Sequence, residues 1–386
     1  MTSLRLLPSY RDLPMFFDEA HAALGERITQ TVKEDDKALH DSEKAGARMA
    51  ELGLFELLVP KELGGKSLVE KGIGVRGLCI AREQLGYVSP LADSIFAVQG
   101  LGSYPLVLAS DAGDRASFFK EVGAGKRIGA FALTEPEAGS DVGAMRTVAR
   151  AEGDEWVIDG EKVFISNATI AHHLVVFANA APELGKKGIS AFLVPKGTRG
   201  LTVETMHLSV DHPLGRVILK GARVPKSALL GEVGHGLRFA LGTLDVFRTS
   251  VGAAACGMAR RAIDESIARV STRKQFGKPL SDFQLTQAAL ADMVAELDAA
   301  RLLVMRAAWM KDRGDRAARE VAIAKMVATE SAQRIIDRAV QLHGGLGVLS
   351  GSVVEALYRE IRPLRIYEGT TEIQKMIIGG SLVPSA

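Results

Sequence analysis

The chain has 386 residues, of which 47% are apolar and 24% are charged, which is enough apolar content for a large core shared between two or three domains. Lys and Arg total 48 against 46 Asp and Glu, a net charge of +2, so composition gives no electrostatic case for a nucleic-acid or polybasic membrane surface. The sequence has no basic segment leading into a long apolar one at its start and no run of 18 apolar residues. We therefore expect neither export nor membrane spanning.

The two cysteines, Cys79 and Cys256, have no CxxC spacing and lie in apolar or small-residue runs. This pattern favours buried, reduced thiols over a disulfide or a metal site. His343 has no Cys, Asp or second His at ligand spacing, so no metal is expected. The cysteine usage indicates a cytoplasmic location.

Residues 1–128 are predicted to form a helical domain. Amphipathic periodicity predicts helices over about 13–31, 36–52 and 74–85. Pro60 and the Gly64-Gly65 pair break the chain between the second and the third.

Residues 129–231 are predicted to form a central β domain. Apolar runs shorten there to strand length, in the segments EWVI, KVFI, HLVVFA, ISAFLV, LTVET and RVIL, and are separated by Gly, Pro, Asn and Asp. Asp159-Gly160, between two of these runs, is a dipeptide that favours a type I′ hairpin.

Residues 232–386 return to the helical period. Three long helices and a shorter terminal one are predicted to form a four-helix bundle, which makes the whole chain mainly α with a central β domain. Many of the apolar-stripe residues are Ala, which favours close packing within the bundle or against another subunit.

The segment RIYEGTTEI, from Arg365 to Ile373, places a carboxylate just before a predicted helix. Thr371 and Gln374 have capping-box spacing, so a helix is expected to begin near Thr371 with its positive dipole end just after Glu368. From these residues alone, Glu368 is either a surface acid that complements the helix dipole or a base beside anion-friendly backbone.

Four further segments bear on structure or function. FALTEPEAGSD opens the β domain with a loop whose N–H groups and small hydroxyls suit a planar, phosphate-bearing ligand. STRKQFGKPLSDFQ joins two long helices, where its basic pair could equally be a solvated turn. QLHGGLG ends the longest helix with glycines that serve as a C-cap in any interpretation. In the β domain, VFISNA is either an ordinary strand or an aromatic set beside a ligand.

Together these segments resemble, in order and over nearly the whole chain, the signature segments of the acyl-CoA dehydrogenase family. The resemblance implies an N-terminal helical domain, a middle β-barrel-like domain and a C-terminal four-helix bundle, with FAD bound at their junction. It implies a homotetramer built as a dimer of dimers, with electron-transfer flavoprotein as the electron acceptor. The implied reaction is FAD-dependent α,β-dehydrogenation of an acyl-CoA to a trans-2-enoyl-CoA.

The resemblance also assigns roles to residues. Glu368 would remove the α-proton while the flavin accepts the β-hydride, and the Glu368 N–H is a candidate donor to the enolate oxygen. Some members carry the base on the first bundle helix, where this chain has Phe247, which cannot act as a base. The FAD contacts implied are Phe131, Leu133, Thr134, Gly139, Ser140, Phe164, Ser166, Arg273, Phe276, Gln284, Gln341, Gly345, Thr370 and Glu372. The substrate contacts implied are Ser140, Asp245, Arg248, Tyr367, Gly369 and Gln99.

Departures from the family pattern leave the substrate open. Asp211 and His212-Pro213 stand where most members have a KxGxRxSxT-like stretch, so the thioester carrier is either CoA or an acyl carrier protein. Gln99 brings an amide to the segment that flanks the far end of the acyl chain, which favours a short, cyclic or polar-ended acyl group. A flavin oxidase or lyase with the same fold is an alternative. A DNA-binding flavoprotein relative is disfavoured because the charge is balanced and no extra basic C-terminal region follows the last motif.

Overall fold

The computed structural model describes residues 8, 10–109 and 115–383. The chain divides into two compact units, which are described separately. Unit 1 contains residues up to Asp36, Val75–Asp93 and the chain from Arg248 onward, and unit 2 contains Lys37–Gly74 and Ser94–Phe247. The long helix α7, Gly236–Thr272, is continuous across the residue 247–248 boundary. Each unit therefore includes part of the predicted N-terminal helical segment.

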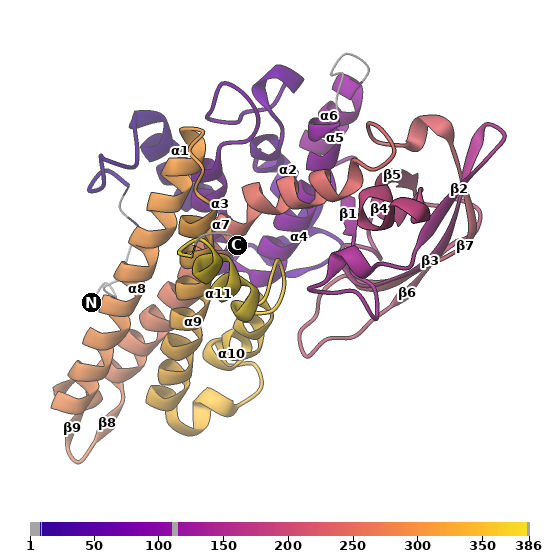
Figure 1. The fold of residues 1–386 in the computed structure, drawn as a ribbon. Coiled ribbons are helices and arrows are strands. Elements are labelled where there is room, and N and C mark those ends of the chain that lie inside the picture. Colours follow the sequence, from indigo (N-terminus) through magenta and orange to yellow (C-terminus); the bar gives the residue numbers. More distant parts are fainter. Residues whose placement is uncertain (1–7, 9, 110–114, 384–386) are drawn as a thin grey trace. The chain divides into compact units, whose positions relative to one another are not determined.

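Unit 2 is built on a seven-stranded sheet, which confirms the predicted β domain (Figure 1). Its strands are β1 Gly129–Ala132, β2 Val148–Glu152, β3 Glu155–Ser166, β4 His173–Asn179, β5 Ile189–Pro195, β6 Leu201–Thr205 and β7 Leu214–Pro225. The order is β1-β4-β2-β3-β7-β6, with β5 paired to β4. The β1–β4 pair is parallel, whereas β3–β7, β4–β5 and β6–β7 are antiparallel. Trp156 on β3 packs edge-on against Phe192 on β5, with ring centroids 5.3 Å apart, inside the core of this sheet.

The hairpin predicted at Asp159-Gly160 is wrong. Both residues lie inside the continuous strand β3, and the β2–β3 pairing closes instead between Glu152 and Glu155. Gly160 has φ +154 at an irregularity in the β3–β7 register. A Cβ there would lie 2.3 Å from Thr147 Oγ1. Glycine is needed for a bulge and a close approach, which short-range turn statistics do not distinguish from a hairpin.

Helices of unit 2 include α2 Ala45–Glu51, most of α4 Pro90–Leu101, α5 Tyr104–Leu108 and α6 Ala116–Gly123. The predicted helix over 36–52 is shorter in the structure, because residues Lys37–His40 form a separate 3₁₀ turn before α2. The segment Pro90–Leu108 is long and apolar enough to cross a membrane by length and composition alone, but 78% of its most apolar window is buried. That burial is typical of a core helix.

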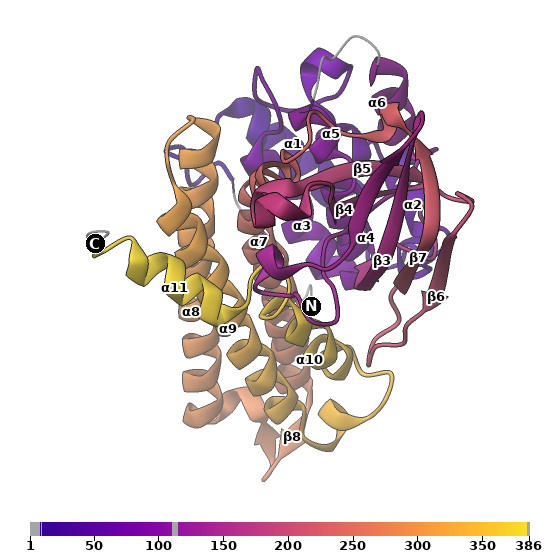
Figure 2. The same ribbon diagram turned by 45° about the vertical axis from the view of Figure 1, so that its right-hand side comes forward.

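Unit 1 is helical, and Figure 2 shows its long helices from a second direction. It contains α1 Glu19–Thr31, α3 Val75–Val88, the α7 residues from Arg248 on, α8 Gln284–Asp312, α9 Ala318–His343, α10 Val353–Leu364 and α11 Thr371–Gly380. Helix α9 packs against α8, α10 and α11, and α3 packs against α1 and α8. The first helix begins at Glu19 and not near residue 13, because Asp18 caps it by accepting a 3.2 Å hydrogen bond from the His21 N–H.

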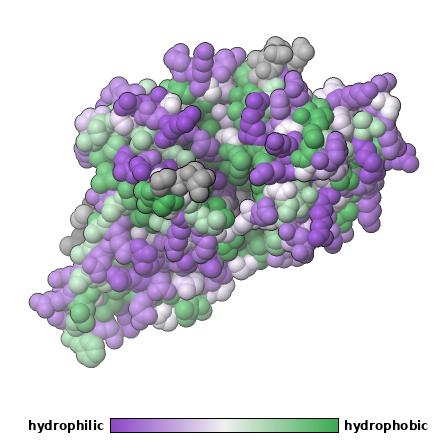
Figure 3. Space-filling view, viewed as in Figure 1, coloured by the Kyte–Doolittle hydropathy of each residue, from purple (hydrophilic) through white to green (hydrophobic). Residues whose placement is uncertain are grey.

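A short hairpin joins α7 to α8. Its strands are β8 Lys274–Gln275 and β9 Lys278–Pro279, and the turn between them contains Phe276 at φ +51 and Gly277 at φ +80. The Phe276 side chain is 94% exposed. Figure 3 shows apolar surface at the end of unit 1 where this hairpin projects.

Candidate active site

Glu368 lies in the turn between α10 and α11 with a left-handed backbone. Its φ is +53, and the next residue, Gly369, has φ +93. A non-glycine residue in this region is uncommon and costs conformational energy. Two consecutive positive φ values reverse the chain sharply, so the surrounding structure must hold this turn in place.

Helix α11 begins at Thr371, as predicted, but its capping residue is Thr370. The Thr370 Oγ1 accepts a 3.3 Å hydrogen bond from the Ile373 N–H. Thr371 instead donates from its own Oγ1 to Glu330 Oε1 on α9, at 2.7 Å. The expected capping box between Thr371 and Gln374 is therefore wrong, because a carboxylate from another helix takes up the Thr371 hydroxyl.

Three side chains hold the two carbonyl oxygens of the positive-φ pair. Arg248 on α7 donates from Nε to the Glu368 oxygen at 3.0 Å. Lys325 on α9 donates from Nζ to the Gly369 oxygen at 2.8 Å, and Gln374 Nε2 donates to the same oxygen at 2.9 Å. Hydrogen bonds from cationic donors are stronger than neutral ones. The backbone that carries Glu368 is thus fixed from two long helices.

The Glu368 carboxylate has the environment of a poised base. Its Oε2 atom is buried and has no hydrogen-bond partner among the described residues. Burial raises the pKa of Glu368 above its ordinary value; the charges of Arg82, Arg248 and Lys325 oppose the rise and Asp93 adds to it. A carboxylate with a raised pKa binds a proton more strongly, which suits proton abstraction near neutral pH.

The main-chain N–H of Glu368 is also available. Within residues 8, 10–109 and 115–383, no acceptor is hydrogen-bonded to it. Buried or half-buried N–H groups normally find an acceptor. A carboxylate and a free N–H on one residue are the two groups that a carbon acid beside a carbonyl requires.

A buried ion pair adjoins this turn within unit 1. Arg82 on α3 forms a fork with Asp93 through Nε and Nη2, both at 2.8 Å, and donates from Nη1 to Ser250 Oγ at 3.0 Å. Arg82 is also hydrogen-bonded to Tyr367, the residue before Glu368, and burial raises the pKa of the Tyr367 phenol. Neither Arg82 nor Asp93 belongs to a recognisable motif, so local sequence patterns give no sign of this pair.

In unit 2, the loop after β1 is tied to β3 by a second buried pair. Lys162 Nζ lies 2.7 Å from Glu135 Oε1 and 3.1 Å from the Leu133 oxygen. The Glu135 carboxylate also accepts from the main-chain N–H groups of Arg146 and Thr147, at 2.6 and 3.0 Å. Burial lowers the Lys162 pKa to about 8, against the opposing effect of Glu135. The Glu135 carboxylate therefore ties the FALTEPEAGSD loop to Lys162 on β3 and to the main chain just after the loop.

Several of the proposed flavin contacts in unit 2 lie close to this anchor. The Val163 N–H donates to the Thr134 oxygen at 3.0 Å, which joins the loop to the residue before Phe164. Phe164 has φ +56 and is 61% exposed. An exposed aromatic held in a strained conformation is a candidate ligand contact.

The other predicted unit 2 contacts differ in exposure. Phe131 and Ser166 are half-buried, Leu133 is buried, and Gly139 and Ser140 are exposed. A Cβ on Gly139 would meet nothing within 4 Å. The loop therefore presents open backbone at Gly139, next to the exposed Ser140.

The remaining predicted flavin contacts lie on the surface of unit 1. Arg273, Phe276 and Gln284 are exposed in and after the β8–β9 hairpin. Gln341 and Gly345 are exposed at the end of α9. Thr370 and Glu372 belong to the start of α11, beside Glu368.

Gln99 has a structural role that sequence reasoning missed. It is fully buried, its Nε2 donates to the Arg127 oxygen at 2.7 Å, and its Oε1 accepts from the Gly129 N–H at 2.8 Å. The amide thus fastens α4 to the start of β1 and carries no argument for a polar acyl group. Burial raises the pKa of the Tyr104 phenol, and the negative charge of Asp245, half-buried on α7, raises it further.

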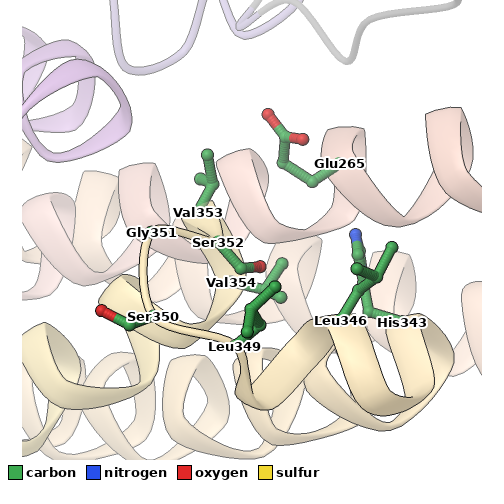
Figure 4. A pocket seen from close by; sticks show the side chains of 9 residues that line it. All are labelled: Glu265, His343, Leu346, Leu349, Ser350, Gly351, Ser352, Val353 and Val354. Carbon is green, nitrogen blue, oxygen red and sulfur yellow. The ribbon is translucent and has the colours of Figure 1, made fainter.

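A cavity of about 360 Å³ lies elsewhere in unit 1, at the end of α9 (Figure 4). Its lining contains no predicted site residue and comprises Glu265, His343, Leu346, Leu349, Ser350, Gly351, Ser352, Val353 and Val354. Over the described part of the chain, no group of three or more His, Cys, Asp or Glu side chains could hold a metal.

Residues 11–126, 130–222 and 234–383 match the N-terminal, middle and C-terminal domains of acyl-CoA dehydrogenases. The human mitochondrial short-chain specific acyl-CoA dehydrogenase is 39% identical over 342 residues, covering 88% of this chain and 82% of the relative. The chain belongs to the acyl-CoA dehydrogenase family. It is an oxidoreductase of the mainly α fold of that family, with a middle β half-barrel, and it performs FAD-dependent dehydrogenation.

Two other relatives are reductases by name. A 3-(aryl)acrylate reductase of Clostridium sporogenes is 36% identical over 381 residues, covering 96% of this chain and all of the relative. A subunit of the caffeyl-CoA reductase–Etf complex of Acetobacterium woodii is 37% identical over 344 residues, covering 87% of this chain and 88% of the relative.

Solved structures agree. A glutaryl-CoA dehydrogenase from Mycobacterium smegmatis in complex with FADH2 superposes with a TM-score of 0.89 at 26% identity, covering 99% of both chains. A prolyl acyl carrier protein oxidase superposes at 0.87 and 26% identity, covering 95% of this chain and all of that one. FAD is the cofactor, and the open backbone at Gly139 and the exposed Phe164 ring fit a planar, phosphate-bearing group.

Proposed function

We propose that this protein converts an acyl thioester to its trans-2-enoyl thioester, with Glu368 as the base. The carboxylate takes the α-proton, and the Glu368 N–H donates to the thioester oxygen as negative charge develops there. FAD, when bound, would accept the β-hydrogen with its electron pair, so the substrate would lose one proton and one hydride. The observation that carries this proposal is the buried, unpartnered Oε2 of Glu368 on a turn whose N–H is also unpaired.

The neighbouring residues suit that chemistry. Arg248 and Lys325 hold the carbonyl oxygens of Glu368 and Gly369, and neither contact involves the Glu368 N–H. Phe247, at the alternative base position, is fully buried and cannot accept a proton. Of positions 247 and 368, therefore, only 368 carries a side chain that can act as a base.

FAD would be held by the loop of Phe131, Leu133, Thr134, Gly139 and Ser140, and by Phe164 and Ser166. Arg273, Phe276, Gln284, Gln341 and Gly345 would serve a neighbouring subunit, whose own copies would complete the site in return. This arrangement supports the proposed homotetramer, since exposed Phe276 and Gln341 have no evident role in an isolated chain.

The acyl group and its carrier are proposed from the relatives and the departures in sequence. The short-chain dehydrogenase and the arylacrylate reductase support a short or cyclic acyl group, whereas Gln99 no longer does. CoA is the proposed carrier, and the name of the prolyl acyl carrier protein oxidase makes a carrier protein the alternative. The caffeyl-CoA reductase–Etf relative supports electron-transfer flavoprotein as the redox partner. Cys79 and Cys256 are free, buried thiols, which supports the proposed cytoplasmic location.

The test is an anaerobic screen for loss of flavin absorbance. The holoenzyme is mixed with butyryl-CoA, 3-phenylpropionyl-CoA, decanoyl-CoA and the butyryl and prolyl thioesters of an acyl carrier protein. We expect the fastest bleaching with butyryl-CoA or 3-phenylpropionyl-CoA. A preference for decanoyl-CoA would reject the short or cyclic group, and bleaching by the carrier-protein thioesters alone would reject CoA. Rapid reoxidation by air without an added acceptor would indicate the oxidase alternative.

A further inference from the structure

Lys325 is a cation buried beside the turn that carries Glu368. Its side chain is completely inaccessible on α9, and its Nζ donates to the Gly369 oxygen at 2.8 Å. Burying an ammonium group costs free energy unless the group is paired. Lys162, which is also fully buried, has the Glu135 carboxylate at 2.7 Å. Lys325 has a main-chain oxygen as its hydrogen-bond acceptor, so a structural salt bridge does not explain its burial.

The acceptor of this hydrogen bond belongs to the turn that carries the base. The Gly369 oxygen belongs to the Gly369–Thr370 peptide, and Arg248 holds the Glu368 oxygen of the preceding Glu368–Gly369 peptide. With both oxygens held, neither of these two peptides can rotate without breaking a hydrogen bond to a charged side chain. The orientation of the Glu368 side chain follows from that of its backbone.

The charge of Lys325 acts on the same carboxylate. Burial lowers the pKa of Lys325 to about 8, and among the charged groups that oppose this effect Glu368 is the largest. Conversely, Lys325 is one of the cations that oppose the raised pKa of Glu368. The charged groups that act on these two residues are Arg82 on α3, Asp93 on α4, Arg248 on α7, Glu330 on α9 and Glu372 on α11.

We propose that Lys325 is a positioning residue for Glu368: its hydrogen bond to the Gly369 oxygen fixes the Gly369–Thr370 peptide that closes the turn of the base, and its positive charge favours the ionised form of the base. The inference rests on the proposed role of Glu368 and extends it to a residue on a different helix.

Three substitutions separate the two effects. Lys325→Arg keeps the charge, Lys325→Gln keeps a donor without the charge, and Lys325→Met keeps neither. Lys375→Met, on the exposed face of α11, removes the same charge from a solvent-screened position and is the control. Flavin content and sedimentation of each holoenzyme are measured first, and then anaerobic flavin reduction by butyryl-CoA or 3-phenylpropionyl-CoA is followed from pH 5.5 to 9.5.

In Lys325→Gln and Lys325→Met we expect the acid limb of the reduction-rate profile to move to higher pH by about one unit. At pH values on the acid limb that shift corresponds to about a tenfold lower rate, and at higher pH the rate recovers. The Met variant should also be slower at the plateau. Lys325→Arg should keep the wild-type limb with a lower plateau, and Lys375→Met should keep both.

An unmoved acid limb in Lys325→Gln would overturn the proposal, even if the Met variant fails to fold. A double-mutant comparison separates this failure from that of the base itself. If Glu368→Gln is inactive and Lys325→Gln resembles wild type, Glu368 remains the base and only the role of Lys325 is lost. If Glu368→Gln reduces flavin normally, the base assignment fails. If Glu368 is the base and Lys325 positions it, adding Lys325→Gln to Glu368→Gln should not lower the rate of flavin reduction any further.

Discussion

Arg248 and Glu368 are 120 residues apart in the chain and are joined by a 3.0 Å hydrogen bond from the arginine Nε to the main-chain oxygen of the glutamate. The contact leaves the Oε2 atom of the Glu368 carboxylate without a hydrogen-bond partner in the described part of the chain. An arginine bound to the carboxylate itself would lower its pKa and weaken it as a base. By holding the backbone, Arg248 fixes the base while its charge only partly opposes the effect of burial on the pKa.

Replacing the base should stop the reaction without disturbing the fold. Glu368→Gln keeps the size of the side chain and removes its basicity, so we expect flavin content and thioester binding to survive. The rate of flavin reduction should fall by about 10² to 10⁴. The measurement is stopped-flow reduction under anaerobic conditions, together with thioester titration by flavin absorbance. If Glu368 only complements the dipole of α11, stability should change by under about 1 kcal/mol and turnover should stay close to wild type.

The exposed hairpin aromatic should matter for assembly and for cofactor retention. Phe276→Ser removes a 94% exposed ring from the tip of the β8–β9 turn. In a free monomer this change would be nearly neutral, whereas at a subunit contact that completes a cofactor site it should lower both the assembly state and the FAD bound per chain. Sedimentation and the ratio of absorbance at 450 and 280 nm measure the two quantities. Leu184→Ser, at a 56% exposed position in unit 2, is the control. A fully flavinylated monomer of the wild-type protein or of the Phe276→Ser variant would contradict the proposed assembly.

The bulge at Gly160 should be intolerant of a side chain. Gly160→Ala places a Cβ 2.3 Å from Thr147 Oγ1 at a backbone angle that favours glycine, and we expect a loss of about 2 to 4 kcal/mol in the free energy of unfolding. Gly153→Ala is the matched control, since Gly153 also has positive φ but a Cβ there would meet nothing within 4 Å. Its cost should be about 1 kcal/mol from backbone strain alone. Denaturation in guanidinium, followed by circular dichroism, distinguishes the two, and equal losses would show that Thr147 yields to the added atom.

Acid should destabilise unit 2 through His173. Burial lowers the pKa of this fully buried side chain to about 4, and its Nε2 bonds to the Gly102 oxygen at 3.0 Å. Between pH 6.5 and 4 the unfolded chain binds a proton at this position that the folded one does not, so stability falls as the pH falls. From pH 7 to 5 the loss is about 2 kcal/mol. His173→Gln should be less stable than wild type at pH 7 but should lose about 2 kcal/mol less over this interval. Parallel pH dependences in the two proteins would assign the acid sensitivity to other groups.

The sequence by itself determined most of the helices and strands and pointed to Glu368 as the proposed base. The change from helical to strand-like periodicity at residues 129–231 predicted the β domain, and the return to a 3.6-residue period predicted the long helices. Four motifs in a fixed order identified the family and Glu368, because motif residues are close together in the chain and short-range patterns record them. The start of α11 at Thr371 was predicted for the same reason.

Only the tertiary structure decided what surrounds those residues. Thr370 caps α11 because Glu330 takes the Thr371 hydroxyl, and Gly160 forms a bulge because Thr147 approaches it. The pairs Arg82–Asp93 and Lys162–Glu135 and the contact of Lys325 with Gly369 join residues 11 to 44 positions apart. A buried charge is tolerated only where a partner meets it, and the position of that partner is set by how helices and strands pack. Local sequence patterns carry no record of that packing, so the groups that tune and hold the base became visible only in the folded chain.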